Sequence, residues 1–366
     1  MIDPDELAAW LRLLETPGVG RESARKLLSA FGSPDAVFRA SASAQRTVAG
    51  SAVAQALGAG HDTLDELIST TLQWLSAAPQ SRTVITLGDP HYPAALLETA
   101  DPPLLMYAQG RLAQLQAPSL AVVGSRNPTP QGLDNARDFA EHFSHAGLAV
   151  VSGLALGIDT AAHEGALRGP SGTVAVVGTG LDQVYPKRNA KLAQRIALEG
   201  LILSEYCLGT PPLPENFPIR NRIIAGLTRG TLVVEAALQS GSLITSRLAG
   251  EAGRDVYAIP GSIHSPQSRG CHALIKQGAK LVDAAQDVLE DLRLASPGAS
   301  SNAPPTEPRA ADPLLDALGY DPVSLEALVA RTGWSAAQLS TKLLELELDG
   351  QVARLPGQLF QRISQG

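Results

Sequence analysis

Cysteine is almost absent from this 366-residue sequence. Its two cysteines, Cys207 and Cys271, form no C-x-x-C pair and show no Cys/His zinc spacing. The sequence therefore predicts neither a disulfide framework nor a structural zinc site. Such sparing use of cysteine is typical of a cytosolic protein, so we expect a cytoplasmic location and no bound metal.

Long apolar runs are also missing. No stretch approaches the length of a membrane span, and the acidic start M-I-D-P-D-E-L lacks the basic and apolar regions of a signal peptide. We therefore expect no signal peptide and no membrane partner. The formal net charge of −7 argues against coating of nucleic acid by bulk charge, but it does not exclude a local basic groove.

Two common nucleotide-binding fingerprints are absent as well. The apolar run at 119–123 ends in Gly124-Ser125-Arg126, which has neither the dinucleotide spacing G-x-G-x-x-G nor that of a P-loop. This disfavours a nicotinamide enzyme, and we predict no cofactor. A buried strand that stops at small residues and feeds a helix is nevertheless an arrangement in which α/β proteins hold anions on backbone amides.

The sequence does contain a regular alternation of short apolar runs and helical segments within 79–295. Strands are predicted at 120–124, 148–152, 173–178, 201–204, 231–235, 255–259 and 280–282. Connections of this kind are right-handed crossovers, so we expect an α/β fold with an extended Rossmann-like, doubly wound and mostly parallel sheet. A proline-rich bridging segment at 79–118 carries apolar pieces at 84–87 and 104–107, which are predicted as edge strands or extended segments.

Residues 1–78 are predicted to form a separate helical domain. Apolar residues at helical spacing flank the turn at 17–20, which indicates a helix, a glycine hairpin and a second helix. This resembles a SAM/helix-hairpin-helix-like element, in which the glycine loop binds a nucleic-acid phosphate and Arg21, Arg25 and Lys26 would add charge. A packed helical hairpin that binds nothing is the alternative, and both stay open.

The composition changes at 296–312, where a linker rich in Pro, Ala and Ser cannot bury a core. Beyond it, 313–366 combines helices, a predicted helix at 335–348 and a short hairpin around Pro356-Gly357, a pattern that resembles a winged helix. Lys342 on the second helix stands against Glu345 and Glu347, which disfavours base reading. We expect a protein-contact or regulatory module instead.

Glycines, hydroxyls and cations gather where the predicted strands end. Glycine lets a phosphate approach the backbone, arginine offers a planar fork for phosphate, and an aromatic or amide side chain can meet an unstacked base. Between 181 and 222 there are six Lys or Arg against four Asp or Glu. The candidates for nucleic-acid binding are Gly124, Ser125, Arg126, Ser152, Gly153, Lys187, Arg188, Asn189, Phe217, Arg220, Asn221, Arg222, Ser240, Gly241, Ser242 and Lys276.

Simpler structural roles stay open for several positions. The cations of R-N-R at 220–222 could pair with Glu205 or Glu215, as charge runs usually do. Asp159 is most simply a residue at a helix start that accepts backbone amides or meets the helix dipole. His163 shares its helix face, but a metal pair is disfavoured because no third ligand stands at a telling spacing.

Six motifs occur in order between Leu120 and Val282: G-S-R, S-G-L-A-L-G-I-D-T-A-A-H, G-T-G-L-D-x-x-Y-P-x-x-N, F-P-I-R-N-R-I-I-A-G-L, S-G-S-L-I-T and I-P-G. This ordered set closely resembles the DNA-processing protein A (DprA/Smf) family. The resemblance implies a homodimer, formed through the Rossmann-like domain, that binds and protects incoming single-stranded DNA in the bacterial cytosol. It further implies loading of the RecA recombinase on that strand during natural transformation and homologous recombination, without catalysis.

The same resemblance assigns the DNA pocket to particular residues. Arg126 of G-S-R, Lys187 of Y-P-K, and Arg220 and Arg222 of R-N-R would line it. Many members carry Thr-x-Tyr-Gly after G-S-R, whereas this chain has Thr-Pro-Gln-Gly at 129–132, so an aromatic contact is absent there.

An enzyme is the alternative from a different class: a nucleotide hydrolase of the lysine-decarboxylase-like Rossmann type. Its candidate acids would be Glu235 and Glu205. The P-G-G-x-G-T signature expected near them is missing, because Gly230-Thr231 precedes the strand and the S-G-S run at 240–242 follows it. The enzyme alternative rests on fold analogy alone, so the sequence favours a binding protein.

Overall fold

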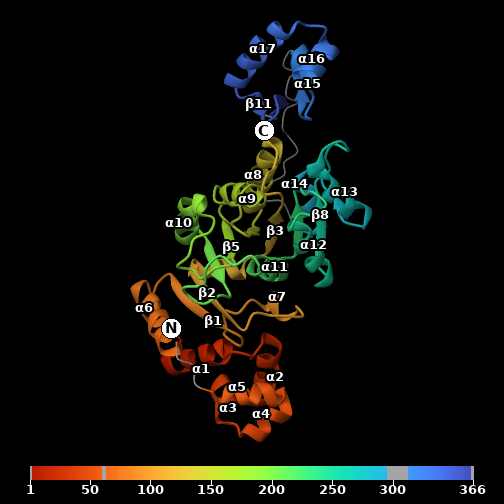
Figure 1. The fold of residues 1–366 in the computed structure, drawn as a ribbon. Coiled ribbons are helices and arrows are strands. Elements are labelled where there is room, and N and C mark those ends of the chain that lie inside the picture. The colour runs from red at the N-terminus through yellow and green to blue at the C-terminus, as the bar shows by residue number, and fades with distance from the viewer. Residues whose placement is uncertain (1, 60–62, 295–311, 364–366) are drawn as a thin grey trace.

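The computed structural model describes residues 2–59, 63–294 and 312–363. Along the chain, a group of helices is followed by a large twisted sheet with helices on both faces, and then by a small helix-and-strand unit (Figure 1). The predicted linker at 296–312 lies outside the described residues, apart from Asp312.

The helical region contains the predicted glycine hairpin between its first two helices. Asp3 begins the first helix by accepting hydrogen bonds from the amides of Asp5 and Glu6, and Gly18 in the turn has a positive φ of 86°. The helices of this region are α1 (Pro4–Glu15), α2 (Arg21–Phe31), α3 (Pro34–Arg39), α4 (Ala42–Ala49), α5 (Ser51–Leu57) and α6 (Leu64–Ala77).

Nine strands form the central sheet, in the order β1-β2-β6-β5-β4-β3-β7-β8-β9. The strands from β3 to β9 are parallel to one another, while β2 pairs antiparallel with both β1 and β6. The strands are β1 (Arg82–Thr86), β2 (Leu105–Gly110), β3 (Ser119–Val123), β4 (Ala149–Ser152), β5 (Thr173–Val177), β6 (Leu201–Ser204), β7 (Gly230–Val233), β8 (Asp255–Ala258) and β9 (Lys280–Leu281). The mostly parallel Rossmann-like sheet is thus confirmed, and of the two bridging strands only β1 is an edge.

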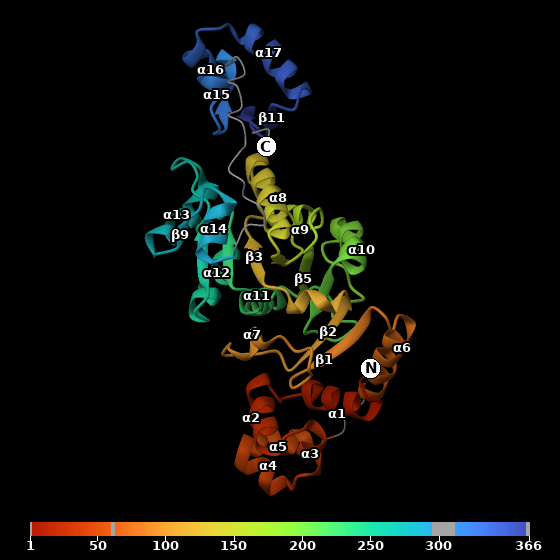
Figure 2. The same ribbon diagram turned by 180° about the vertical axis from the view of Figure 1, so that it is seen from behind.

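Both faces of the sheet are covered along its five central strands, β3 to β7, in which every residue is buried. In β3, Leu120 and Val122 pack into one apolar cluster while Ala121 and Val123 pack into the other. Figure 2 shows α8 and α9 on one side of the strands, with α11 on the other. The helices are α7 (Ala94–Leu97), α8 (Pro130–His145), α9 (Ile158–Ala166), α10 (Ala190–Glu199), α11 (Asn216–Leu227), α12 (Ser242–Glu251), α13 (Arg269–Lys276) and α14 (Ala285–Asp291), with 3-10 turns η1 (Leu112–Gln116), η2 (Lys187–Asn189) and η3 (Pro266–Ser268).

The order of the strands reverses between β3 and β7. From β3 the chain proceeds to β4, β5 and β6 on one side, and from β7 it proceeds to β8 and β9 on the other. The loops after β3 and β7 therefore turn to opposite faces and leave a crevice at their carboxyl ends. This is the position at which doubly wound folds bind ligands.

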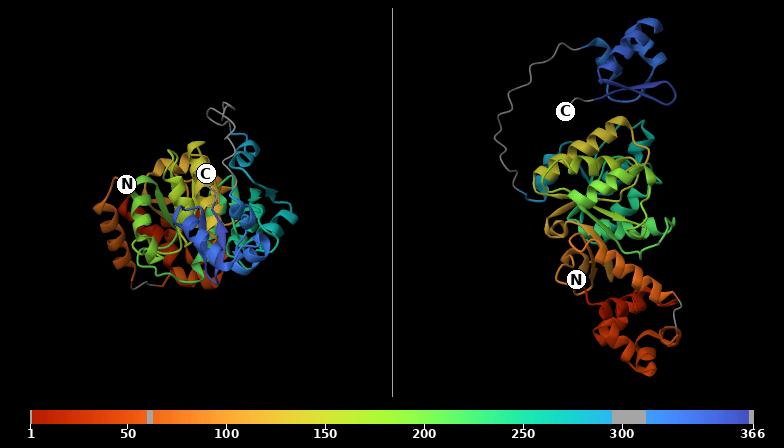
Figure 3. Two further views of the ribbon diagram at one scale, coloured as in Figure 1. Left: turned by 90° about the horizontal axis from the view of Figure 1, so that it is seen from above. Right: turned by 90° about the vertical axis from the view of Figure 1, so that its left-hand side faces the viewer.

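The helical region packs against β1 and β2 rather than standing apart (Figure 3). Trp10 and Trp74 from the helices share an apolar cluster with Leu104 and Tyr107 from the bridging segment. The rings of Trp74 and Tyr107 meet edge to face, with 6.0 Å between their centroids. The bridging segment thus joins the helical region to the sheet through a common core.

The C-terminal unit has its own core and the predicted winged-helix pattern. Its three strands pair antiparallel in the order β10-β12-β11, and Ser335 and Gln338 form a capping box at the start of its long helix. The tight hairpin falls at Gly357, which has a positive φ of 84°. The elements are α15 (Pro313–Leu318), β10 (Val323–Ser324), α16 (Leu325–Thr332), α17 (Ala336–Leu348), β11 (Val352–Leu355) and β12 (Leu359–Arg362).

Candidate nucleic-acid interface

A crevice of about 480 Å³ opens at the carboxyl ends of β3 and β7. Half of the residues predicted from the sequence meet here, although they lie far apart in the chain. Those that line it are Gly124, Ser125, Arg126, Arg220, Asn221, Ser240, Gly241 and Ser242. The hydroxyl oxygens of Ser240 and Ser242 are 2.7 Å apart, at the start of α12.

The loop after β3 is held tightly against its neighbours. The amide of Ser125 donates to the carbonyl of Glu235 at 2.7 Å, and the carbonyl of Ser125 accepts from the amide of Ile158 at 3.1 Å. A Cβ at Gly124 would lie 2.7 Å from the Ile158 side chain, so only glycine fits. The loop then turns so that Arg126 is exposed, and its guanidinium makes no ion pair with the residues that the structure describes.

Glu235 and Glu205, the two acids considered for a hydrolase, are both engaged in structural bonds. The Glu235 carboxylate accepts from the amide and the hydroxyl of Thr129, at 2.9 and 2.6 Å, and burial raises its pKa. Glu205 is paired with Arg222 at 2.5 Å and with Arg21 at 3.5 Å. Each carboxylate therefore holds together two segments distant in sequence.

Two buried residues of opposite charge, Arg220 and Asp159, line the crevice. Arg220 is only 4% exposed, donates to the carbonyl of Val176 and has a buried Nε without a hydrogen-bond partner in the described structure. Burial lowers its pKa to about 10, although Asp159 opposes the shift. Asp159 accepts from the amides of Gly153 and Ala155 at 3.1 and 3.3 Å, so it fixes the loop before α9 and does not cap its own helix, which begins after Gly157.

His163 is a structural residue rather than a ligand in this structure. Its Nε2 accepts from the amide of Leu154 at 3.3 Å, which places the proton on Nδ1. Nδ1 lies 2.7 Å from the hydroxyl of Thr173, which itself donates to the carbonyl of Val150 at 2.6 Å. Complete burial lowers the pKa of His163 to about 3, so the ring is neutral. Within the described residues, no three His, Cys, Asp or Glu side chains gather as a metal site.

A second group of predicted residues lies on η2, outside the crevice. Lys187 and Arg188 are exposed, whereas Asn189 is buried and donates to the carbonyl of Leu154 and the hydroxyl of Thr160, both at 2.9 Å. Asn189 therefore joins the loop after β4 to the loop after β5 and positions the two cations before it.

Two aromatic rings stand next to these cations. The rings of Phe217 and Tyr185 are 5.5 Å apart between centroids and tilted by 36°, and Tyr185 is 48% exposed. Phe217 was predicted from the sequence and Tyr185 was not. The Tyr-Pro step directly before Lys187 was the available signal.

The structure does not bring every predicted residue to a free surface. Ser152 is fully buried and donates to the carbonyl of Val122 at 2.7 Å, and Gly153 lies against the Arg220 head group. Arg222 takes the simpler role left open from the sequence, because it pairs with Glu205 at 2.5 Å and with Asp101 at 2.8 Å. Lys276 is exposed at the end of α13 and does not line the crevice.

The cations of the N-terminal hairpin are likewise paired. Arg21 and Arg25 both contact Asp101, and Lys26 contacts Glu22 at 2.8 Å. In this structure the hairpin packs against the bridging segment. Its cations make ion pairs within the chain.

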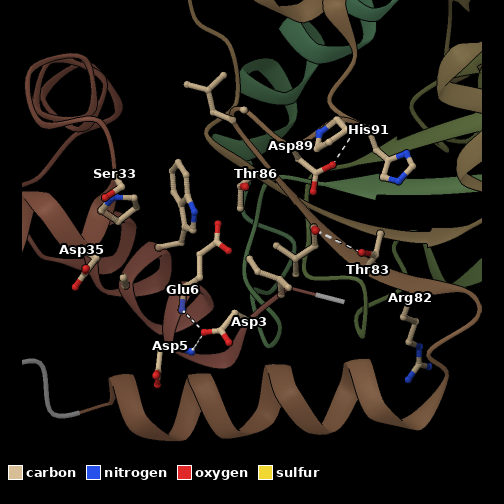
Figure 4. A pocket seen from close by; sticks show the side chains of 18 of the residues that line it. Asp3, Asp5, Glu6, Ser33, Asp35, Arg82, Thr83, Thr86, Asp89 and His91 are labelled. Atoms are coloured by element: carbon tan, nitrogen blue, oxygen red, sulfur yellow. Dashed lines mark hydrogen bonds between the residues drawn. The ribbon is translucent and has the colours of Figure 1, made fainter.

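A larger cavity of about 1190 Å³ lies at the junction of the helical region with β1 (Figure 4). Five carboxylates from three segments line it: Asp3, Asp5, Glu6, Asp35 and Asp89. They outnumber the two arginines of the lining, Arg39 and Arg82, and this excess of negative charge opposes a phosphate backbone. The smaller crevice is therefore the better candidate for nucleic acid.

Two models of known protein families match this chain. The family model of DNA recombination-mediator protein A matches residues 83–293, and that of the DprA winged helix domain matches residues 298–358. The chain belongs to the DprA/Smf family. This DprA/Smf chain is 42% identical to Protein Smf of Escherichia coli over 299 residues, which are 79% of each chain. It is 52% identical to DNA processing protein DprA of Streptococcus pneumoniae over 203 residues, which are 56% of this chain and 72% of the relative.

Two solved structures are similar as well. The crystal structure of DNA processing protein A from S. pneumoniae matches with a TM-score of 0.64 and 40% identity, over 78% of this chain and 97% of that one. DNA processing protein A from Helicobacter pylori, whose structure is described as revealing a unique single-stranded DNA binding mode, matches with a TM-score of 0.53 and 32% identity, over 58% and 95%. Separately, no described helix of the chain is long and apolar enough to cross a bilayer.

The packing of Arg220 against Gly153 gives a first prediction. A Cβ at Gly153 would lie 2.7 Å from Cζ of Arg220. The Arg220 guanidinium cannot easily move away, because it is buried and donates a hydrogen bond to a carbonyl. Gly153→Ala should therefore lower the free energy of unfolding by about 1–3 kcal/mol. Urea unfolding measures this. Gly241→Ala is the matched control, because its Cβ would meet nothing within 4 Å. Equal stability of the two variants would contradict the packing described.

The buried neutral His163 predicts a pH dependence of stability. Its pKa of about 3 in the folded chain lies below the unfolded value of about 6.5, so between these values only the unfolded chain binds the proton. As the pH falls below about 6.5, this residue should lower the free energy of unfolding by about 1.4 kcal/mol per pH unit. Urea unfolding at several pH values should show a smaller slope for His163→Gln. His145→Gln, at an exposed position, should retain the wild-type slope.

Proposed function

We propose that this chain binds single-stranded DNA along the strand-end edge of its sheet and mediates recombination without catalysing a reaction. The observation that carries the proposal is the crevice at β3 and β7, where Arg126, Arg220 and the hydroxyls of Ser240 and Ser242 converge. Guanidinium groups, hydroxyls and the amides of a helix start are the groups that bind phosphate. Asp159 also lines the crevice, but its carboxylate is occupied by two amides.

The η2 patch would extend this site along the strand. Lys187 and Arg188 are exposed cations without an ion pair in the described structure, and the rings of Tyr185 and Phe217 lie next to them. Proteins that bind single strands without reading their sequence use cations along the backbone and aromatic rings that stack on unpaired bases. The single-stranded DNA binding mode described for the H. pylori relative supports the same interpretation.

The role in recombination is the finer part of the proposal. We infer that the chain protects incoming single strands in the bacterial cytoplasm and loads RecA on them during natural transformation. The match to a recombination-mediator family supports this inference. We also infer a homodimer through the Rossmann-like domain, which is supported by the open edge at β9, where Leu281 is 47% exposed.

DNA binding is tested by titrating a fluorescent oligothymidine at several salt concentrations. Arg126→Ala and Lys187→Ala should each weaken binding about tenfold and reduce the slope of log K against log salt by about 0.7 for each phosphate that the variant no longer neutralises. Arg229→Ala is the matched control, because Arg229 is an exposed cation that precedes β7, at the opposite end of the strand. An unchanged affinity in both site variants, or an affinity independent of salt, would refute the proposed interface.

Recombinase loading needs a separate measurement. The rate at which fluorescently labelled RecA assembles on single strands already covered by a single-stranded DNA-binding protein should rise when the chain is added. The Arg126→Ala/Lys187→Ala variant should give less than a tenth of that increase, because the mediator must hold the strand that it hands over. A wild-type chain that binds the oligonucleotide but leaves the rate unchanged would remove the loading role alone.

A further inference from the structure

An apolar groove of about 600 Å³ runs between α10 and β2, beside the η2 patch. Ala193 and Ile202, which are 4% and 9% exposed, form buried parts of its lining. Val184 and Leu198 line it from more exposed positions, at 40% and 73%. In Figures 1 and 2, α10 lies next to the strands on the side away from α12 and α13.

The exposure of Leu198 has no explanation within the fold. The inward face of α10 is already complete, because Leu192, Ala193 and Ile196 are buried against the sheet. Leu198 contributes nothing to that core and leaves a large apolar side chain in water. Exposed apolar side chains next to a buried apolar floor are characteristic of sites that hold an anchoring side chain of a partner.

Arg111 is the one charged residue in the described lining of the groove. It is exposed and makes no ion pair with a described residue, while the described lining contains no Asp or Glu. The two nearest carboxylates in sequence are occupied: Asp182 accepts from the amide of Gly209 at 2.8 Å, and Glu199 pairs with Arg195 at 3.4 Å. The rest of the polar lining is serine and glutamine.

We propose that this groove binds a short segment of a partner protein that combines bulky apolar side chains with carboxylates. The apolar side chains would enter between Val184 and Leu198, and a carboxylate would accept two parallel hydrogen bonds from the Arg111 guanidinium. The described lining includes no aromatic ring on which a base could stack, which separates this groove from the η2 patch.

The position of the groove gives it a further consequence. Its wall at 181–184 leads directly into Tyr185 and the cations of η2, so a bound partner would stand beside that patch without covering the crevice at β3 and β7. The inference does not depend on the proposed function, because the groove and the crevice share no lining residue.

The experiment uses the full chain and a fluorescent peptide of three acidic residues followed by Leu-Phe-Leu. Fluorescence anisotropy should show saturable binding, and Leu198→Ser and Arg111→Glu should each weaken it at least tenfold. Leu97→Ser, at a leucine 56% exposed outside the groove, and Arg229→Glu, at an exposed cation elsewhere, should stay within twofold of wild type. All four positions are exposed, so none of the substitutions removes a core contact. The affinity of Leu198→Ser for oligothymidine should be unchanged.

Three results would overturn the proposal. The first is the absence of saturable peptide binding, and the second is equal binding of a peptide in which lysines replace the acidic residues. The third is a Leu198→Ser variant that binds the peptide normally but self-associates less in sedimentation than the Leu97→Ser control. That result would make the groove an interface between copies of this chain.

Discussion

The candidate interface depends on one hydrogen-bonded junction, between the loop after β3 and the loop after β7. The Ser125 amide donates to the carbonyl of Glu235, and the Glu235 carboxylate accepts two hydrogen bonds from Thr129. Because this carboxylate is partly buried, its hydrogen bonds to Thr129 offset the cost of removing it from water. The two loops that leave the sheet in opposite directions are thereby fixed to each other, and Arg126 is left facing solvent at the crevice.

The chain is acidic overall, yet one edge of its sheet is basic, because some of its cations are paired with carboxylates and others are not. The net charge is −7. Three arginines, Arg21, Arg25 and Arg222, make ion pairs with Asp101 inside the chain. This cluster secures the helical region to α11 across the bridging segment. Arg126 and the cations of η2 remain unpaired among the described residues, while carboxylates collect around the cavity at the other end of the sheet. Distribution, rather than total charge, decides where a polyanion can approach.

The sequence predicts the sheet well because its strands are apolar on both faces and end at small residues, as β3 does before Gly124. It also predicts the convergence of Arg126 with the S-G-S run at 240–242, because parallel strands bring their carboxyl ends to one edge. It does not predict the roles of Ser152 and Asn189 or the contact of Arg222 with Asp101, although the pairing of Arg222 with Glu205 was one of its alternatives. Their partners are the carbonyls of Val122 and Leu154 and the carboxylate of Asp101, which lie 30 or more positions away and meet them only after folding.

The two parts of the proposed DNA interface differ in how firmly their cations are held. Arg220 is dehydrated and fixed by a carbonyl, so its charge is weakly screened and acts at one point in the crevice. Lys187 is exposed, hydrated and free to move on a flexible stem. A strand held in this way would be fixed at one phosphate and adaptable at the next, with the rings of Tyr185 and Phe217 accepting any base. Such an arrangement suits the binding of single strands without sequence preference.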